Sequence, residues 1–73
     1  MTVAEAVAKE INQAIEEQAL TNEKVAAKAQ VSVRTLTAFR KAERGNITTH
    51  PLEQIAIALN KRLVIRFEDL NPN

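Results

Sequence analysis

The apolar positions in the first quarter of the chain recur at helical spacing. Intervals of three or four residues place them on one face of an α-helix; this stripe consists of Val3, Val7, Ile11, Ala14 and Ile15. Thr2 and Glu5 have the spacing of a capping box, in which each residue satisfies a first-turn amide of the other. We therefore expect a helix that runs from Thr2 to about Gln18.

Two shorter helical patterns follow, joined by a tight corner. Thr21 is a favourable N-cap for a helix over residues 22–29, and Ser32 is one for a third helix. Val31 and Leu36 flank the second cap at the spacing of a hydrophobic staple, which sets the angle at which the third helix begins. Gly45, within Glu43–Asn46, is the expected left-handed residue that ends this helix. The expected inward-facing residues are Val25, Ala26 and Ala29, then Leu36, Phe39 and Ala42.

A fourth helix is expected after Thr48 or Thr49, either of which can cap it. Pro51 falls in its first turn, where a missing amide hydrogen costs little. Its core side is expected to contain Leu52, Ile55, Ala56 and Leu59.

Over residues 62–68 the spacing of the apolar residues changes, and apolar and polar residues alternate with a period of two. Leu63, Ile65 and Phe67 share one face, which predicts a β-strand. A lone strand leaves its backbone amides and carbonyls unpaired. Pairing with the same strand of a second copy, antiparallel about a twofold axis, would satisfy them and predicts a homodimer. The alternative is an extended tail that lies on the helices.

Composition limits the kind of site this chain can hold. Its 73 residues correspond to one domain over residues 1–73. There is no cysteine and one histidine, which excludes disulfides and thiolate metal sites, and we expect neither a metal nor a cofactor. No apolar run is long enough to span a bilayer and no secretory signal is present, so the expected location is cytoplasmic, without a membrane partner.

The net charge of +1 conceals a strongly uneven distribution. Residues 1–23 contain one lysine and five glutamates, whereas residues 24–44 contain six basic residues and one glutamate. Residues 45–73 are balanced. A basic segment in the middle of the chain favours a polyanionic partner, although a solvated helix face would have the same composition.

The segment NEKVAAKAQVSVRTLTAF, residues 22–39, resembles the helix-turn-helix of the lambda-repressor-like family (Cro/repressor, XRE-type). The resemblance covers about Leu20–Leu63; its matching features are Ala26, Val31–Ser32, Leu36, Phe39, the ERGN that follows and the later LEQIAIAL. It implies a mainly α fold with four helices, a helix-turn-helix over residues 22–43 and a C-terminal strand that pairs across a dimer. The family usually has glycine where this chain has Gln30, so either Gln30 is left-handed or the turn differs from that of the family. The family also commonly has five helices.

Helix geometry and the resemblance together indicate a DNA-contacting surface. Arg34 is the main expected base contact, bidentate to guanine. The expected base contacts are Val33, Arg34, Thr37 and Ala38. The expected backbone contacts are Asn22, Ser32, Arg40, Lys41 and Arg44. The residues expected to form the dimer are Leu63, Ile65 and Phe67.

The expected function is therefore that of a transcriptional repressor that binds a palindromic operator in double-stranded DNA as a homodimer. Two alternatives remain open. One is an antitoxin that regulates its own operon and neutralises a partner toxin, as some relatives with such a strand do. The other is a protein-interaction module without DNA binding. An enzyme with a small-molecule substrate is not expected, because no nucleophile–base pair, phosphate-binding glycine loop or metal-ligand spacing occurs.

Overall fold

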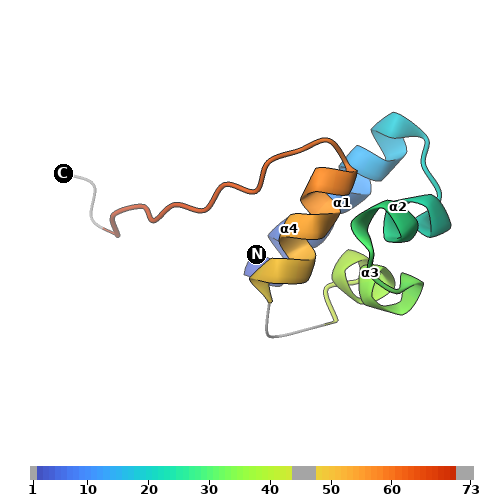
Figure 1. The fold of residues 1–73 in the computed structure, drawn as a ribbon. Helices are drawn as coiled ribbons and strands as arrows, with labels where there is room; N and C mark the ends of the chain where they lie inside the picture. The colour runs from blue at the N-terminus through green and yellow to red at the C-terminus, as the bar shows by residue number, and fades with distance from the viewer. Residues whose placement is uncertain (1, 44–47, 71–73) are drawn as a thin grey trace.

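The computed structural model describes residues 2–43 and 48–70, and these residues form a mainly α-helical fold (Figure 1). The four helices are α1 (Val3–Gln18), α2 (Asn22–Ala29), α3 (Val33–Arg40) and α4 (Thr49–Ala58). The prediction of four helices is confirmed, and the bounds of α1 and α2 agree with those expected from the apolar spacing.

Side-chain caps begin the first three helices. Thr2 and Glu5 form the predicted capping box, with Glu5 N donating to Thr2 Oγ1 at 3.1 Å and Thr2 N donating to Glu5 Oε1 at 2.8 Å. The backbone amide of Thr2, and next its side chain, stabilise the carboxylate and lower the pKa of Glu5. Thr21 and Ser32 accept hydrogen bonds from the amides of Lys24 and Thr35. These bonds are local, which explains why short sequence patterns predict them.

Each helix is followed by a residue in the left-handed conformation. The four are Ala19, Gln30, Ala42 and Asn60, with φ between 53° and 59°. In each case the next amide donates to the carbonyl five residues earlier, as Val31 N does to Ala26 O at 3.1 Å. This is the Schellman arrangement, which satisfies carbonyls of the last turn. Of the two possibilities for the turn after α2, the structure has the left-handed Gln30, with φ 59°.

The predicted end of the third helix at Gly45 is wrong. Helix α3 ends at Arg40, and the chain reverses at Ala42, whose φ is 55°. The physical reason lies in α1, because Asn12 Nδ2 donates to the carbonyl of Arg40 at 3.1 Å and satisfies an acceptor of the last turn. Gly45 itself lies outside the described residues.

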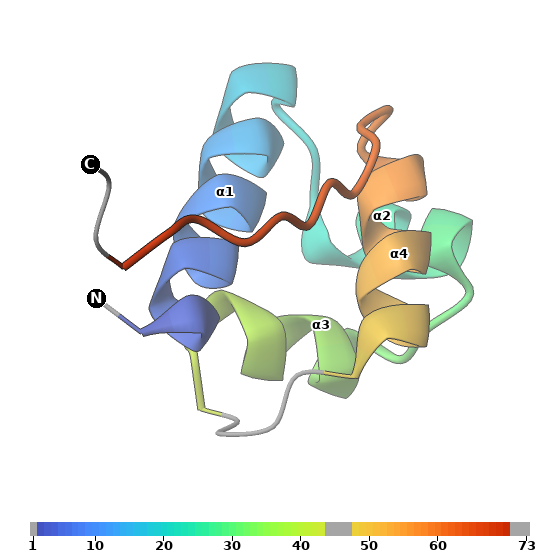
Figure 2. The ribbon, with the colours of Figure 1, turned by 90° about the vertical axis from the view of Figure 1, so that its left-hand side faces the viewer.

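The core lies where α2 packs against both α3 and α4, while α1 packs against α3 (Figure 2). Val25, Leu36 and Ile55 are fully buried at its centre. The predicted inward faces are confirmed in the main, Phe39 and Leu59 among them, although the predicted Ala42 and Ala56 are only half-buried. Leu20, Val31 and Leu63 pack at the edge of the core. Val3 is the exception, since it is 71% exposed in the first turn of α1.

The C-terminal tail, residues 61–70, leaves α4 as an extended segment (Figure 1). Within the described part of this single chain it forms no strand. Leu63 packs against the core, whereas Ile65 is 66% and Phe67 99% exposed. A ribbon between two copies needs a second chain, so the strand stays a prediction.

None of the four described helices combines the length and apolar character needed to cross a bilayer.

Candidate nucleic-acid interface

Helix α3 presents one side to solvent because the opposite side is held in the core. Leu36 is fully buried and Phe39 is 2% exposed, so both point into the protein. With about 100° of rotation per residue, Arg34 lies opposite these two side chains. Arg34 is exposed, and Val33 is 40% exposed. The predicted base-contacting residues Thr37 and Ala38 are half-buried at the margins of this surface.

The corner before α3 positions its first turn. Ser32 is exposed, and its hydroxyl accepts from Thr35 N at 3.0 Å and bonds Thr35 Oγ1 at 2.9 Å. Val31 packs at the edge of the core cluster that contains Leu36, as the predicted staple requires. The N-terminus of α3, with Arg34 on it, is therefore attached to the core on one side and open on the other.

Arg40 connects three helices through hydrogen bonds that the sequence did not suggest. Its Nε donates to Asn12 Oδ1 of α1, and its Nη1 donates to Asn22 Oδ1 of α2, each at 2.5 Å. Arg40 and Asn22 were both predicted to contact the DNA backbone independently, and the structure brings them into one half-buried network. Asn12 was missed because it lies 28 residues before Arg40, with no local pattern that links the two.

The Arg40 network borders a polar hollow of about 270 Å³ beside the N-terminus of α2. Its lining residues are Asn12, Asn22, Thr37, Arg40 and Lys41. Four of these belong to the predicted DNA-contacting set, so the fold gathers residues that are up to 19 positions apart in sequence. A helix N-terminus with two cations beside it is an environment that favours an anion.

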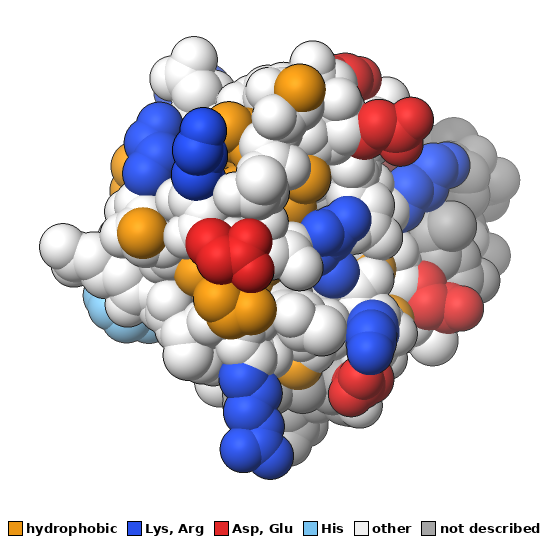
Figure 3. Space-filling view, turned by 90° about the vertical axis from the view of Figure 1, so that its right-hand side faces the viewer, with side chains coloured by type: hydrophobic (Ala, Val, Ile, Leu, Met, Phe, Trp, Pro, Cys, Tyr) orange, Lys and Arg blue, Asp and Glu red, His pale blue; other side chains and the backbone are white. Residues whose placement is uncertain are grey.

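The basic side chains on this side of the molecule are spread across the surface. Figure 3 shows several Lys and Arg side chains on the side where α2 and α3 lie, with Glu side chains between them. Lys24, Lys28 and Lys41 are exposed on or next to these helices, and so is Glu23. Such a surface is weakly positive and favours a few defined contacts to a polyanion over a uniform basic patch.

Replacement of Arg40 by methionine is expected to destabilise the fold by roughly 1–3 kcal/mol, because the oxygens of Asn12 and Asn22 lose their charged donor. Urea unfolding monitored by circular dichroism at a fixed protein concentration measures this loss. Lys41→Met is the matched control, since Lys41 is adjacent but exposed, and it is expected to change stability by less than about 0.5 kcal/mol. Equal stability of the two variants would contradict a structural role for Arg40.

The remaining predicted site residues divide into two groups. Arg44 lies outside the described residues. Leu63, Ile65 and Phe67 lie on the tail, away from the exposed side of α3.

Within residues 2–43 and 48–70, no three His, Asp or Glu side chains form a group suited to holding a metal ion. Comparison of the chain with protein-family models, curated proteins and solved structures finds no match in any of the three.

Proposed function

We propose that this protein is a sequence-specific, double-stranded-DNA-binding transcriptional repressor of the lambda-repressor-like type. The observation that supports this proposal most directly is the packing of α2 and α3. Leu36 and Phe39 hold α3 against the core and leave Arg34 exposed on its outer side. The major groove of B-DNA is about 12 Å wide and admits one α-helix presented in this way.

The exposed side of α3 supplies the base contacts. Arg34 has the length and the planar guanidinium needed to bond both acceptors on the major-groove edge of guanine. Val33 is apolar and 40% exposed beside it, which suits the methyl group of thymine. Thr37 and Ala38 lie further along the helix and contact bases at the edge of the site.

The polar hollow at the N-terminus of α2 receives a backbone phosphate. Lys41 contributes an exposed cation, and Asn22 is the first residue of α2, where the amides before that of Lys24, which Thr21 caps, have no acceptor within the helix. Arg40 holds the Asn22 side chain and adds a positive charge to the wall of the hollow. Contacts of this kind orient α3 on the duplex and contribute affinity without base preference.

A homodimer would present two copies of α3 to the same face of DNA. Pairing of the tails through Leu63, Ile65 and Phe67 provides the twofold axis. Recognition helices related by this axis read an inverted repeat whose half-sites lie about one helical turn apart, roughly 34–36 Å. This arrangement predicts a palindromic operator.

Selection of bound sequences from a random duplex pool, followed by gel-shift titration of the selected site, tests this function. We expect an inverted repeat with guanine in each half-site and affinity that falls steeply between 50 and 200 mM salt. Lys41→Ala is expected to lower the slope of log affinity against log salt by about 1 for each protomer. Enrichment of no sequence, together with no retardation of any duplex at moderate salt, would overturn the proposal and favour a protein-interaction module.

A further inference from the structure

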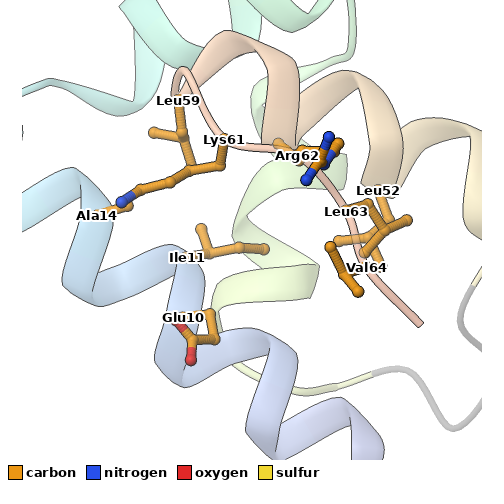
Figure 4. A pocket seen from close by; sticks show the side chains of 10 residues that line it. Glu10, Ile11, Ala14, Leu52, Leu59, Lys61, Arg62, Leu63 and Val64 are labelled. Atoms are coloured by element: carbon orange, nitrogen blue, oxygen red, sulfur yellow. The ribbon is translucent and has the colours of Figure 1, made fainter. Parts of the chain in front are cut away.

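An apolar groove lies beside the first residues of the tail. In a single chain both the groove and the tail leave apolar surface exposed to solvent. The groove has a volume of about 380 Å³ and lies between α1 and α4 (Figure 4). Ile11, Leu52 and Leu63 are among its lining residues, with Glu10 and Lys61 at its rim. Beyond Leu63 the tail carries Ile65, Phe67 and Leu70 at 66%, 99% and 97% exposure. An apolar groove and several bare apolar side chains on one short segment indicate an interaction surface.

The two sides of the tail differ in character: the side that bears Arg66 and Glu68 is mixed, since it also carries Val64 and Leu70, whereas the other side is apolar from Leu63 to Phe67. Arg66 Nη2 contacts Glu68 Oε1 at 3.5 Å, which places these two residues on the same side of the extended backbone. The alternation of an extended chain puts Ile65 and Phe67 on the other side, in register with Leu63. Leu63, at the start of this side, packs against the core, whereas Ile65 and Phe67 beyond it are 66% and 99% exposed, so in a single chain most of this apolar side is uncovered.

We propose that the tail pairs with the tail of a second copy of this chain, antiparallel, with Ile65 opposite the partner's Ile65. This inference rests on the proposed homodimer and specifies its register and the occupant of the groove. In this register Ile65 lies opposite the partner's Ile65, and Leu63 lies opposite the partner's Phe67. Arg62 lies opposite the partner's Glu68, Lys61 opposite the partner's Asp69, and Val64 opposite the partner's Arg66. Both charged pairs are of opposite sign, which stabilises a ladder.

Neighbouring registers lose this complementarity. A centre at Val64 places Arg66 opposite the partner's Arg62, and a centre at Arg66 places that arginine opposite itself; like charges in these positions are destabilising. A centre at Phe67 keeps one pair of opposite charge, Arg66 with the partner's Glu68, but it places the Asp69 carboxylate opposite Ile65 and no longer sets Phe67 opposite Leu63. An axis that passes between two residues sets the apolar side of one tail against the polar side of the other.

The Ile65-centred register also fills the groove. Phe67 then lies directly across from the partner's Leu63, with Cβ atoms about 4.5–5.5 Å apart. Since Leu63 lines the groove, the Phe67 ring enters the groove of the partner between its α1 and α4. A buried phenylalanine removes roughly 150–250 Å² from water. Because of the twofold axis, this contact occurs twice: the Phe67 ring of each protomer enters the groove of the other.

A cysteine scan determines the register, because the chain has no cysteine of its own. The full-length single variants are Leu63→Cys, Val64→Cys, Ile65→Cys, Arg66→Cys and Phe67→Cys, each oxidised mildly and resolved on a non-reducing gel. Directly opposed residues have Cα atoms about 4.5–5.5 Å apart, within disulfide range, whereas residues two positions out of register exceed about 7 Å. We expect Ile65→Cys to convert most of the chain to a covalent dimer, at least tenfold faster than Val64→Cys or Arg66→Cys.

A charge exchange provides an independent readout of the same register. Arg62→Glu and Glu68→Arg are each expected to raise the dimer dissociation constant in sedimentation equilibrium at least tenfold, and the double variant is expected to restore it. Fastest cross-linking at another position, or no rescue in the double variant, would overturn the register. A monomer that binds DNA would overturn the tail pairing and leave the DNA-binding proposal standing, so the two failures are distinguishable.

Discussion

Arg34→Ala is expected to abolish sequence-specific DNA binding while the protein remains folded. A bidentate arginine–guanine contact contributes about 1–3 kcal/mol of discrimination. A dimer makes this contact in both half-sites, so the expected loss of operator affinity is on the order of 30-fold to 10⁴-fold. Arg34 is exposed on the side of α3 that faces away from the core, so its removal leaves no packing defect. Gel-shift titration against the selected operator and a scrambled duplex measures the effect.

Arg34→Lys is the matched control for this prediction. Lysine keeps the positive charge but lacks the planar pair of donors that addresses both guanine acceptors. We expect the lysine variant to keep near-normal affinity for scrambled DNA and to lose most of the preference for the operator. Unchanged operator affinity in Arg34→Ala would show that this residue makes no base contact. Loss of affinity for all duplexes to the same extent would instead assign it to the phosphate backbone.

Leu36→Ala is expected to lower the free energy of unfolding by about 2–5 kcal/mol and to lower the midpoint of thermal unfolding with it. Leu36 is fully buried at the junction of the helices. Leucine-to-alanine substitutions at such positions cost about 2–5 kcal/mol, through lost transfer energy and the cavity that remains. A chain of 73 residues has a total stability of roughly 4–11 kcal/mol at ordinary values per residue. The loss is therefore a large share of the total, and thermal unfolding by circular dichroism at constant protein concentration measures it.

Val33→Ala is the control within the same helix. Val33 is 40% exposed, so its truncation removes few buried contacts and is expected to change stability by less than about 0.5 kcal/mol. The two variants also separate two causes of lost DNA binding. Leu36→Ala is expected to lose binding together with helical signal, whereas Val33→Ala is expected to keep the helical signal and weaken only binding to sites that contain the relevant thymine. A Leu36→Ala variant with unchanged stability would contradict the central position of this residue in the core.

Local features of the structure were predictable because their causes lie within a few residues. The Thr2–Glu5 capping box joins residues three apart, and the caps at Thr21 and Ser32 act on the first turn of their own helices. A left-handed Gln30 was one of two possibilities for the short corner between α2 and α3, and the structure has it. The exposed position of Arg34 on α3 follows from helical spacing alone.

The predictions failed where a partner distant in sequence competed with a local signal. Gly45 is a strong local signal for a helix end, yet α3 ends at Arg40, where Asn12 of α1 bonds the carbonyl. The regular spacing of Val3 placed it in the core stripe, but no element covers that end of α1 and Val3 is exposed. The alternation of residues 62–68 is visible in sequence, whereas pairing depends on a second chain.

The sequence by itself determined where the helices begin, which sides of them are apolar and that the side of α3 bearing Arg34 faces outward, because capping and periodicity act over one or two turns. Tertiary structure decided where α3 ends, that Arg40 serves as a bridge between Asn12 and Asn22, and that these residues share one hollow with Lys41. Those features depend on contacts between side chains brought together only when α1, α2 and α3 pack, and spacing along a single helix contains no information about them.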